Sequence, residues 1–203
     1  IRYAVDNGAK VINMSFGKGF SPNSEKVQDA IAYAASKDVL MIHAAGNDAA
    51  NVDEVPNFPH KPLVDQPSNL SRLMFLNIGA NTKEKGKKMV ADLSNFGAIE
   101  VDVFAPGNEI YNTVPQSEYK NLQGTSMAAP MVTGAVALLL QTNPKLTPEM
   151  AKSSLSDYAT SDINMGNLPN NTWGNGLLNV QAAIKGTEIT VNVDELYSSS
   201  SIT

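Results

Sequence analysis

A serine at the start of a long apolar stretch is the first residue in this sequence that could do covalent chemistry. Ser126 lies within Gly124-Thr125-Ser126-Met127-Ala128-Ala129-Pro130, before an apolar run that continues to Thr142. In the first turn of a helix, backbone N–H groups have no partner in the helix, and the helix dipole favours negative charge. Both features would stabilise the oxyanion that forms when a serine hydroxyl attacks a carbonyl. Taken alone, Ser126 could equally be a helix N-cap.

Five further segments accompany this serine along the chain. They are Lys10-Val11-Ile12-Asn13-Met14-Ser15-Phe16-Gly17, Ala44-Ala45-Gly46-Asn47-Asp48, Ser94-Asn95-Phe96-Gly97, Asp102-Val103-Phe104-Ala105-Pro106-Gly107 and Trp173-Gly174-Asn175-Gly176-Leu177-Leu178-Asn179-Val180. In this order, and together with the Ser126 segment, they resemble the signature stretches of the subtilase family of serine peptidases. The resemblance indicates that residues 1–186 correspond to the C-terminal half of a subtilase catalytic domain. Residues 187–203 are expected to form a C-terminal tail of disordered composition.

The resemblance assigns catalytic roles to two residues. Ser126 matches the nucleophile, and Asn47 matches the residue whose side-chain amide donates to the oxyanion beside the backbone N–H of Ser126. These roles imply a serine endopeptidase that forms an acyl-enzyme. Read without the resemblance, Asn47 would also suit a turn after a strand.

The same resemblance implies where a polypeptide substrate would bind. The implied contacts are Ser15, Phe16 and Gly17 in an edge segment, Ala44, Ala45 and Gly46 in a pocket wall, and Thr125 beside the nucleophile. The edge segment would pair with an extended peptide backbone, which gives broad specificity. The small residues of the wall predict a pocket that accepts a medium or large apolar side chain before the scissile bond.

Two features depart from the family pattern. Pro130 is followed by Met131, where many members have a histidine that is not part of the catalytic triad. The larger departure concerns the triad itself, whose order in the family is Asp, His, Ser. The segments that carry the Asp and the His do not occur in this sequence. We therefore expect both residues in an N-terminal half that precedes Ile1, and we expect this chain alone to be inactive. His43 and His60 are interpreted as structural residues rather than general bases.

Composition argues against several other functions. The formal net charge is −5, so no nucleic acid is expected as a partner, and the lysine-rich segment 83–88 is interpreted as a solvated turn. The sequence has no cysteine, which excludes disulfides and thiolate metal sites. No carboxylate cluster has the spacing of a calcium loop, so no metal or cofactor is assigned. The resemblance allows a structural calcium ion without placing it. No apolar run approaches the roughly 20 residues of a membrane span, and the resemblance implies a secreted or cell-envelope protein.

The elements that must position these residues alternate between strand and helix. Strands are predicted at 10–16, 39–45, 74–78, 89–93 and 101–104, helices at 1–7, 24–37, 126–142, from 147 onward and at 177–184, and an irregular excursion at 48–71. This order predicts right-handed crossovers and an α/β fold with a mostly parallel sheet flanked by helices. The resemblance makes it a three-layer subtilisin-like fold whose N-terminal part lies outside the chain. An exposed sheet edge would then favour self-association of the chain on its own.

Three alternatives compete with an active peptidase. A degenerate subtilase, or an inactive fragment of one, would use the groove only to bind peptides. The sedolisins, a related enzyme class, have an Asp where Asn47 stands here, and Asn47 therefore argues against them. A nucleotide-binding α/β domain is disfavoured because no glycine-rich phosphate loop follows the first strand.

Overall fold

The centre of the fold is a parallel sheet, described by a computed structural model that covers residues 1–55, 57–61, 69–84, 86–160 and 176–187. The strand order is β1-β2-β3-β4. The strands are β1 (Val11–Met14), β2 (Leu40–Ala44), β3 (Phe75–Asn81) and β4 (Val103–Pro106). Every residue of β2 is buried, as expected for a parallel strand covered on both faces. The predicted α/β fold with a parallel sheet is confirmed.

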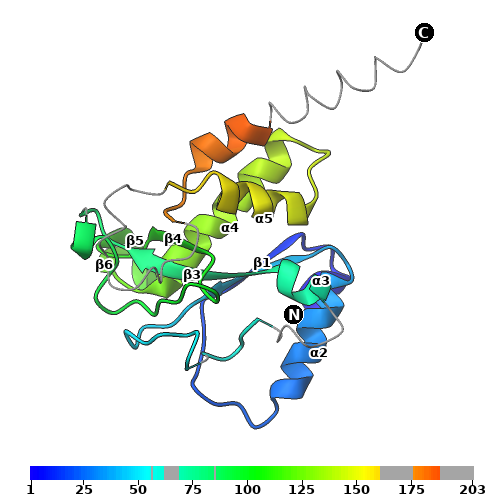
Figure 1. The fold of residues 1–203 in the computed structure, drawn as a ribbon, viewed down its shortest axis with the longest axis horizontal. Coiled ribbons are helices and arrows are strands. Elements are labelled where there is room, and N and C mark those ends of the chain that lie inside the picture. Colours follow the sequence, from blue (N-terminus) through cyan, green and yellow to red (C-terminus); the bar gives the residue numbers. More distant parts are fainter. Residues whose placement is uncertain (56, 62–68, 85, 161–175, 188–203) are drawn as a thin grey trace.

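Helices cover the sheet on two sides. They are α1 (Arg2–Asp6), α2 (Ser24–Ala35), α3 (Asn69–Leu73), α4 (Thr125–Thr142), α5 (Pro148–Asp157) and an unlabelled helix at 180–187. Figure 1 shows α4 and α5 on one side of the sheet and α2 and α3 on the other. The result is a three-layer arrangement in which the start of α4 lies at the end of the sheet where β1 and β2 finish.

The helix α4 is the main element on its face of the sheet. It contacts all four strands, and its buried residues include the small side chains Ala128, Ala129 and Ala135, which allow close packing on the strands. By length and composition, α4 is also the one helix among the described residues that could cross a membrane. The buried face of α4 packs on the sheet. A helix in a protein core can have the same length and apolar composition as a membrane span, so these two properties alone are weak evidence.

Several predicted elements differ from the structure. Residues 89–93 form no strand, and only an isolated bridge joins Val90 to Asn81. The last residues of the excursion predicted as irregular form the start of α3, which ends at Leu73. An antiparallel hairpin of β5 (Ile110–Val114) and β6 (Glu118–Leu122) was not predicted. The middle of the excursion (62–68), the motif residues Trp173-Gly174-Asn175 and the predicted tail at 188–203 lie outside the described residues.

Candidate active site

The serine predicted as nucleophile lies in the first turn of α4. Gly124 precedes the helix with φ +141°, a conformation that L side chains rarely adopt. The Ser126 hydroxyl donates to the backbone carbonyl of Ser15 at 3.3 Å, and the Ser15 hydroxyl donates to the carbonyl of Ser126 at 2.9 Å. These two bonds fasten the start of α4 to the segment that follows β1.

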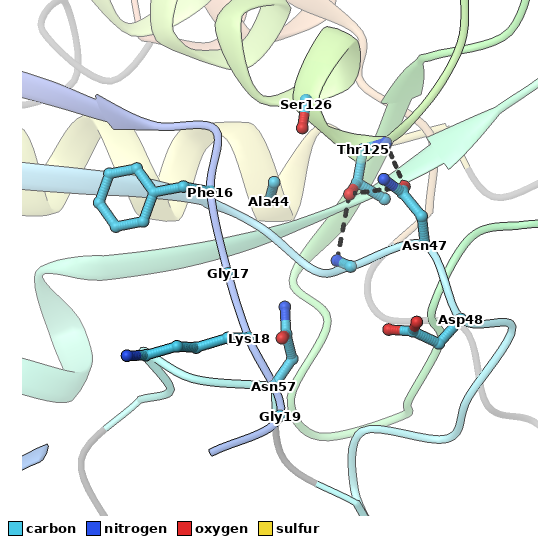
Figure 2. A pocket seen from close by; sticks show the side chains of 11 residues that line it. Phe16, Gly17, Lys18, Gly19, Ala44, Asn47, Asp48, Asn57, Thr125 and Ser126 are labelled. Carbon is cyan, nitrogen blue, oxygen red and sulfur yellow. Dashed lines mark hydrogen bonds between the residues drawn. The ribbon is translucent and has the colours of Figure 1, made fainter. Parts of the chain in front are cut away.

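Asn47 and Thr125 are joined at the same place (Figure 2). The Oδ1 of Asn47 accepts from the backbone N–H of Thr125 at 2.9 Å and from its hydroxyl at 3.1 Å. The Thr125 hydroxyl oxygen in turn accepts from the N–H of Gly46 at 3.1 Å. Because the oxygen of the Asn47 amide is engaged by Thr125, its Nδ2 is the end available to donate. A Cβ at Gly124 would lie 3.2 Å from that Nδ2, so glycine leaves the amide its space beside the helix start.

A cavity of about 270 Å³ opens between the segment after β1, residues 16–19, and the segment at the end of β2, residues 44–48 (Figure 2). It is lined by Phe16, Gly17, Lys18, Gly19, Ala44, Gly46, Asn47, Asp48, Asn57, Thr125 and Ser126. Seven of the nine residues predicted from the sequence for catalysis or binding line this cavity, and the two that do not are Ser15 and Ala45. The structure therefore brings the predicted nucleophile, the predicted amide donor and the predicted pocket wall to one place.

Thr125, which is a buried lining residue, and the two residues that do not line the cavity contribute in different ways. Thr125 has no exposed surface, so its hydroxyl acts through Asn47 and Gly46. Ala45 is also fully buried and packs with Val52 and Phe104 in a second apolar cluster. Ser15, which is half-buried, reaches the site through its hydrogen bonds with Ser126.

Two asparagines that complete the site were not predicted. Asn57 donates from Nδ2 to the carbonyl of Ala45 at 3.1 Å, and a Cβ at Gly17 would lie 2.6 Å from that nitrogen. Its amide thus occupies the space between the two walls, and Figure 2 shows it on the side of the cavity away from Ser126. Asn57 stands in the proline-rich stretch interpreted as a surface excursion, where nothing in the sequence distinguishes it from other polar loop residues.

Asn95 holds the loop that carries Asn47. Its Nδ2 donates to the carbonyl of Ala45 at 2.9 Å, and its Oδ1 accepts from the N–H groups of Asp48 at 2.9 Å and Ala50 at 3.0 Å. Asn95 belongs to the Ser94–Gly97 motif and is buried. The motif was a signal for this residue, but it did not indicate which backbone groups the side chain would bind.

Neither histidine is hydrogen-bonded to Ser126 within the described part of the chain. The Nε2 of His43 lies 2.8 Å from the carbonyl of Phe16, and its Nδ1 lies 3.1 Å from the amide of Asn77. Burial lowers the pKa of His43 below its ordinary value of 6.5, with the two hydrogen bonds acting in the opposite direction. The Nδ1 of His60 lies 2.8 Å from the carbonyl of Lys61. Among the residues described, no three His, Cys, Asp or Glu side chains are grouped so that they could hold a metal ion.

The parallel α/β sheet, with a serine at the start of the helix that crosses it, is the architecture of a subtilisin-like protease domain, as its similarity to solved structures shows. Comparison with known proteins agrees. Residues 1–176 match the model of the Peptidase_S8 or subtilase family, and the chain therefore belongs to this family of serine proteases.

Individual relatives are similar over most of this chain but are longer. Subtilisin DY of Bacillus licheniformis is 34% identical over 183 residues, which are 90% of this chain and 60% of the relative. The cell wall-associated protease of Bacillus subtilis is 32% identical, with 98% of this chain and 22% of the relative covered. The structure of the prenylagaramide maturation protease PagA superposes with a TM-score of 0.74 at 30% identity, covering 91% of this chain and 64% of that chain. The chain thus spans about 60% of the length of subtilisin DY.

Proposed function

We propose that the protein carrying this chain is a serine endopeptidase in which Ser126 forms an acyl-enzyme. The observation that carries the proposal is the bonding of Asn47 to Thr125, because it leaves the Asn47 Nδ2 as the available donor beside the first turn of α4. The Ser126 oxygen attacks the carbonyl carbon of the scissile bond. The oxyanion accepts hydrogen bonds from Asn47 Nδ2 and the Ser126 N–H, the amine leaves, and water then releases the acyl group.

The proton of the Ser126 hydroxyl needs an acceptor during the attack. In this structure the hydroxyl donates to the carbonyl of Ser15, which is too weak a base for that role. We therefore propose that the triad His and Asp come from an N-terminal half of the same domain that docks beside β1. The support is that β1 is an edge strand of the sheet and leads directly into Ser15. No step of the proposal uses a metal or a cofactor.

The substrate is proposed to be an extended polypeptide that lies along residues 15–17. The residue before the scissile bond enters the cavity that ends at the Asn57 amide. This amide and the exposed side chains of Lys18 and Asp48 make the cavity more polar than the alanine and glycine wall alone would indicate. The family and the cell wall-associated relative support a secreted or cell-envelope location.

The proposal is tested on the full-length protein with a fluorophosphonate probe and peptide substrates. We expect labelling at Ser126, and no labelling or hydrolysis after Ser126→Ala. Ser153→Ala changes an exposed serine on α5 and is the matched control, which should behave as the unmodified protein. Asn47→Ala should lower kcat by about 10²–10³, the range established for the equivalent donor in subtilisin, a relative of this chain. Labelling of another residue, or Ser126→Ala with full activity, would contradict the assignment.

A second candidate is a protein of this family that binds peptides without cleaving them. The bond from the Ser126 hydroxyl to Ser15 and the engagement of both histidines elsewhere favour it, since neither histidine is in place as a base. The same experiment separates the two candidates. Peptide binding by the full-length protein without labelling of Ser126 and without turnover would support the binding function.

A further inference from the structure

The segment that would hold the substrate leaves the sheet where β1 ends. The ladder between β1 and β2 stops at the pair Met14 and His43, and the cavity opens beyond this pair. Phe16 lies past the end of the ladder, and its side chain is 58% exposed. Packing of its own side chain therefore does not fix the position of this segment.

Hydrogen bonds hold the segment at three points instead. At its start, Ser15 is bonded to Ser126, as described above. At its end, Lys18 and Phe58 exchange two backbone hydrogen bonds, at 2.9 Å and 2.8 Å. Between these points, the carbonyl of Phe16 is bound by the imidazole Nε2 of His43 at 2.8 Å. A side chain of β2 thus replaces the missing ladder bond.

The ring of His43 is itself held firmly. It has no exposed surface, and it packs against Phe75 with ring centroids 5.6 Å apart. Its register partner on β3 is Asn77, whose amide lies 3.1 Å from Nδ1. The backbone N–H of Asn77 is bound in turn by the Asp102 carboxylate at 2.7 Å. The imidazole is therefore a rigid bridge from the sheet to Phe16.

The hydrogen bonds also assign the proton on the ring. A carbonyl oxygen only accepts, so Nε2 must carry hydrogen to bind Phe16. The atom of Asn77 placed 3.1 Å from Nδ1 is Oδ1, which only accepts. A neutral ring with its proton on Nε2 therefore requires the Asn77 amide to be turned so that Nδ2 donates to Nδ1.

We propose that His43 is a positioning residue for the substrate. By holding the Phe16 carbonyl, it sets the separation between residues 15–17 and the strand end at 44–46, and the peptide substrate lies between these two walls. This inference rests on the proposed peptidase function, because it concerns how that same groove recognises an extended peptide. Ser126 is placed by the helix α4 and Asn47 by its bonds to Thr125, so His43 should affect peptide binding more than the chemical step.

Two substitutions of similar size, His43→Gln and His43→Asn, distinguish a role in positioning the substrate from a role in stabilising the fold. In His43→Gln the amide nitrogen can reach the place of the imidazole Nε2 and donate to Phe16. In His43→Asn the shorter side chain keeps a polar group near Asn77 but does not reach Phe16. Both variants bury an amide at the same site. If His43 had a purely structural role, the two substitutions would therefore change the KM for the peptide by the same amount.

The measurement is made on the full-length protein with a short ester and with an extended peptide substrate. For the peptide, we expect KM to rise about tenfold in His43→Asn, the size of one lost hydrogen bond, and to stay near the original value in His43→Gln. The short ester and the rate of fluorophosphonate labelling should change little in either variant. Equal KM values in the two variants, or equal losses for ester and peptide, would overturn the inference. Absence of labelling and hydrolysis in the unmodified protein would instead overturn the proposed function, and with it this inference.

The imidazole can also be observed directly, which keeps the test open if a variant fails to fold. Nitrogen and proton NMR of the unmodified protein at neutral pH should show a slowly exchanging proton on the Nε2 of His43. The chemical shift of this proton should change when a peptide aldehyde inhibitor binds along residues 15–17. A proton on Nδ1 alone, or a signal insensitive to the inhibitor, would contradict the role.

Discussion

The amide oxygen of Asn47 accepts two hydrogen bonds from Thr125, one from the backbone N–H and one from the hydroxyl. A side-chain amide in a loop would otherwise be free to rotate, and either of its ends could face the substrate. The two bonds fix the oxygen toward the start of α4 and leave the nitrogen to donate. Preorganisation of this kind makes a donor effective at an oxyanion, because it does not have to be oriented during the reaction.

Removal of the Thr125 hydroxyl should therefore lower catalysis through Asn47. Thr125→Val keeps the shape of the side chain but removes the bonds to Asn47 and Gly46. We expect kcat for a peptide to fall by about tenfold or more, with KM nearly unchanged, because only binding of the transition state is weakened. Thr125→Ser retains a hydroxyl and is the matched control. An unchanged kcat in Thr125→Val would show that the backbone bond alone orients Asn47.

The sequence motifs predicted the main chemical groups but not the contacts that hold them in place. Ser126 and Asn47 were predicted because their segments resemble signature stretches of the subtilase family. The role of Thr125 was predicted only as proximity to substrate, since its full burial and its bond to Asn47 depend on packing between α4 and the end of β2. Asn57 is brought to the cavity by the path of a loop, and no local pattern encodes that path.

The fold was predictable to a similar extent. The central strands were recognised because burial on both faces makes them continuously apolar. The hairpin was missed because its strands are largely exposed and its turn contains Gln116 and Ser117 at positive φ, where turn rules expect Gly or Asn. Residues 89–93 are apolar in part, but Met89 and Val90 are buried outside any strand, and apolar character alone does not distinguish the two cases.

Asn57 should control which side chain precedes the scissile bond. Asn57→Gly removes the amide that fills the space next to Gly17 and should raise kcat/KM for peptides with Phe at that position by about tenfold or more. Peptides with Gln there should lose a hydrogen-bonding partner and be cleaved more slowly. Asn23→Gly changes an exposed asparagine outside the cavity and is the control. The measurement is kcat/KM for a set of peptides that differ only at this residue. The same order of preference in both variants would contradict a role of Asn57 in specificity.

Asp102 should be required for stability rather than for the chemical step. Its carboxylate pairs with Lys61 at 2.8 Å, where the two side chains are 9% and 4% exposed, and it also accepts from the Asn77 N–H. Asp102→Asn leaves the Lys61 ammonium buried without its countercharge, which should lower the free energy of unfolding by about 3–5 kcal/mol. Glu109→Gln breaks a pair of the same length with Lys83, but both side chains are exposed, and it should have little effect. Denaturant titrations of the two variants test this contrast, and equal losses would contradict it.

The buried imidazole of His43 should make stability depend on pH. Burial is the largest cause that lowers its pKa, and the charge of His60 acts in the same direction, whereas the bonds to Asn77 and Phe16 oppose them. In the unfolded chain the ring binds a proton as pH falls through 6.5, its ordinary pKa, while in the folded protein it remains neutral to lower pH. The unfolded state then binds more protons, so stability decreases as pH falls below that value, by up to about 1.4 kcal/mol per pH unit for one proton.

The loss should stop once pH falls below the folded pKa of His43, because both states then bind the proton. His43→Gln removes the titrating group and retains a buried polar side chain, so the difference between its stability and that of the unmodified protein isolates this residue. We expect that difference to be constant above about pH 7 and to change steadily below about pH 6.5, with the variant losing less stability. If the free energy of unfolding of the two proteins changed with pH in parallel across this range, the pKa of His43 would not be lowered in the folded state. The contact with Phe16 would persist in either case, because Nε2 carries hydrogen in the imidazolium as well.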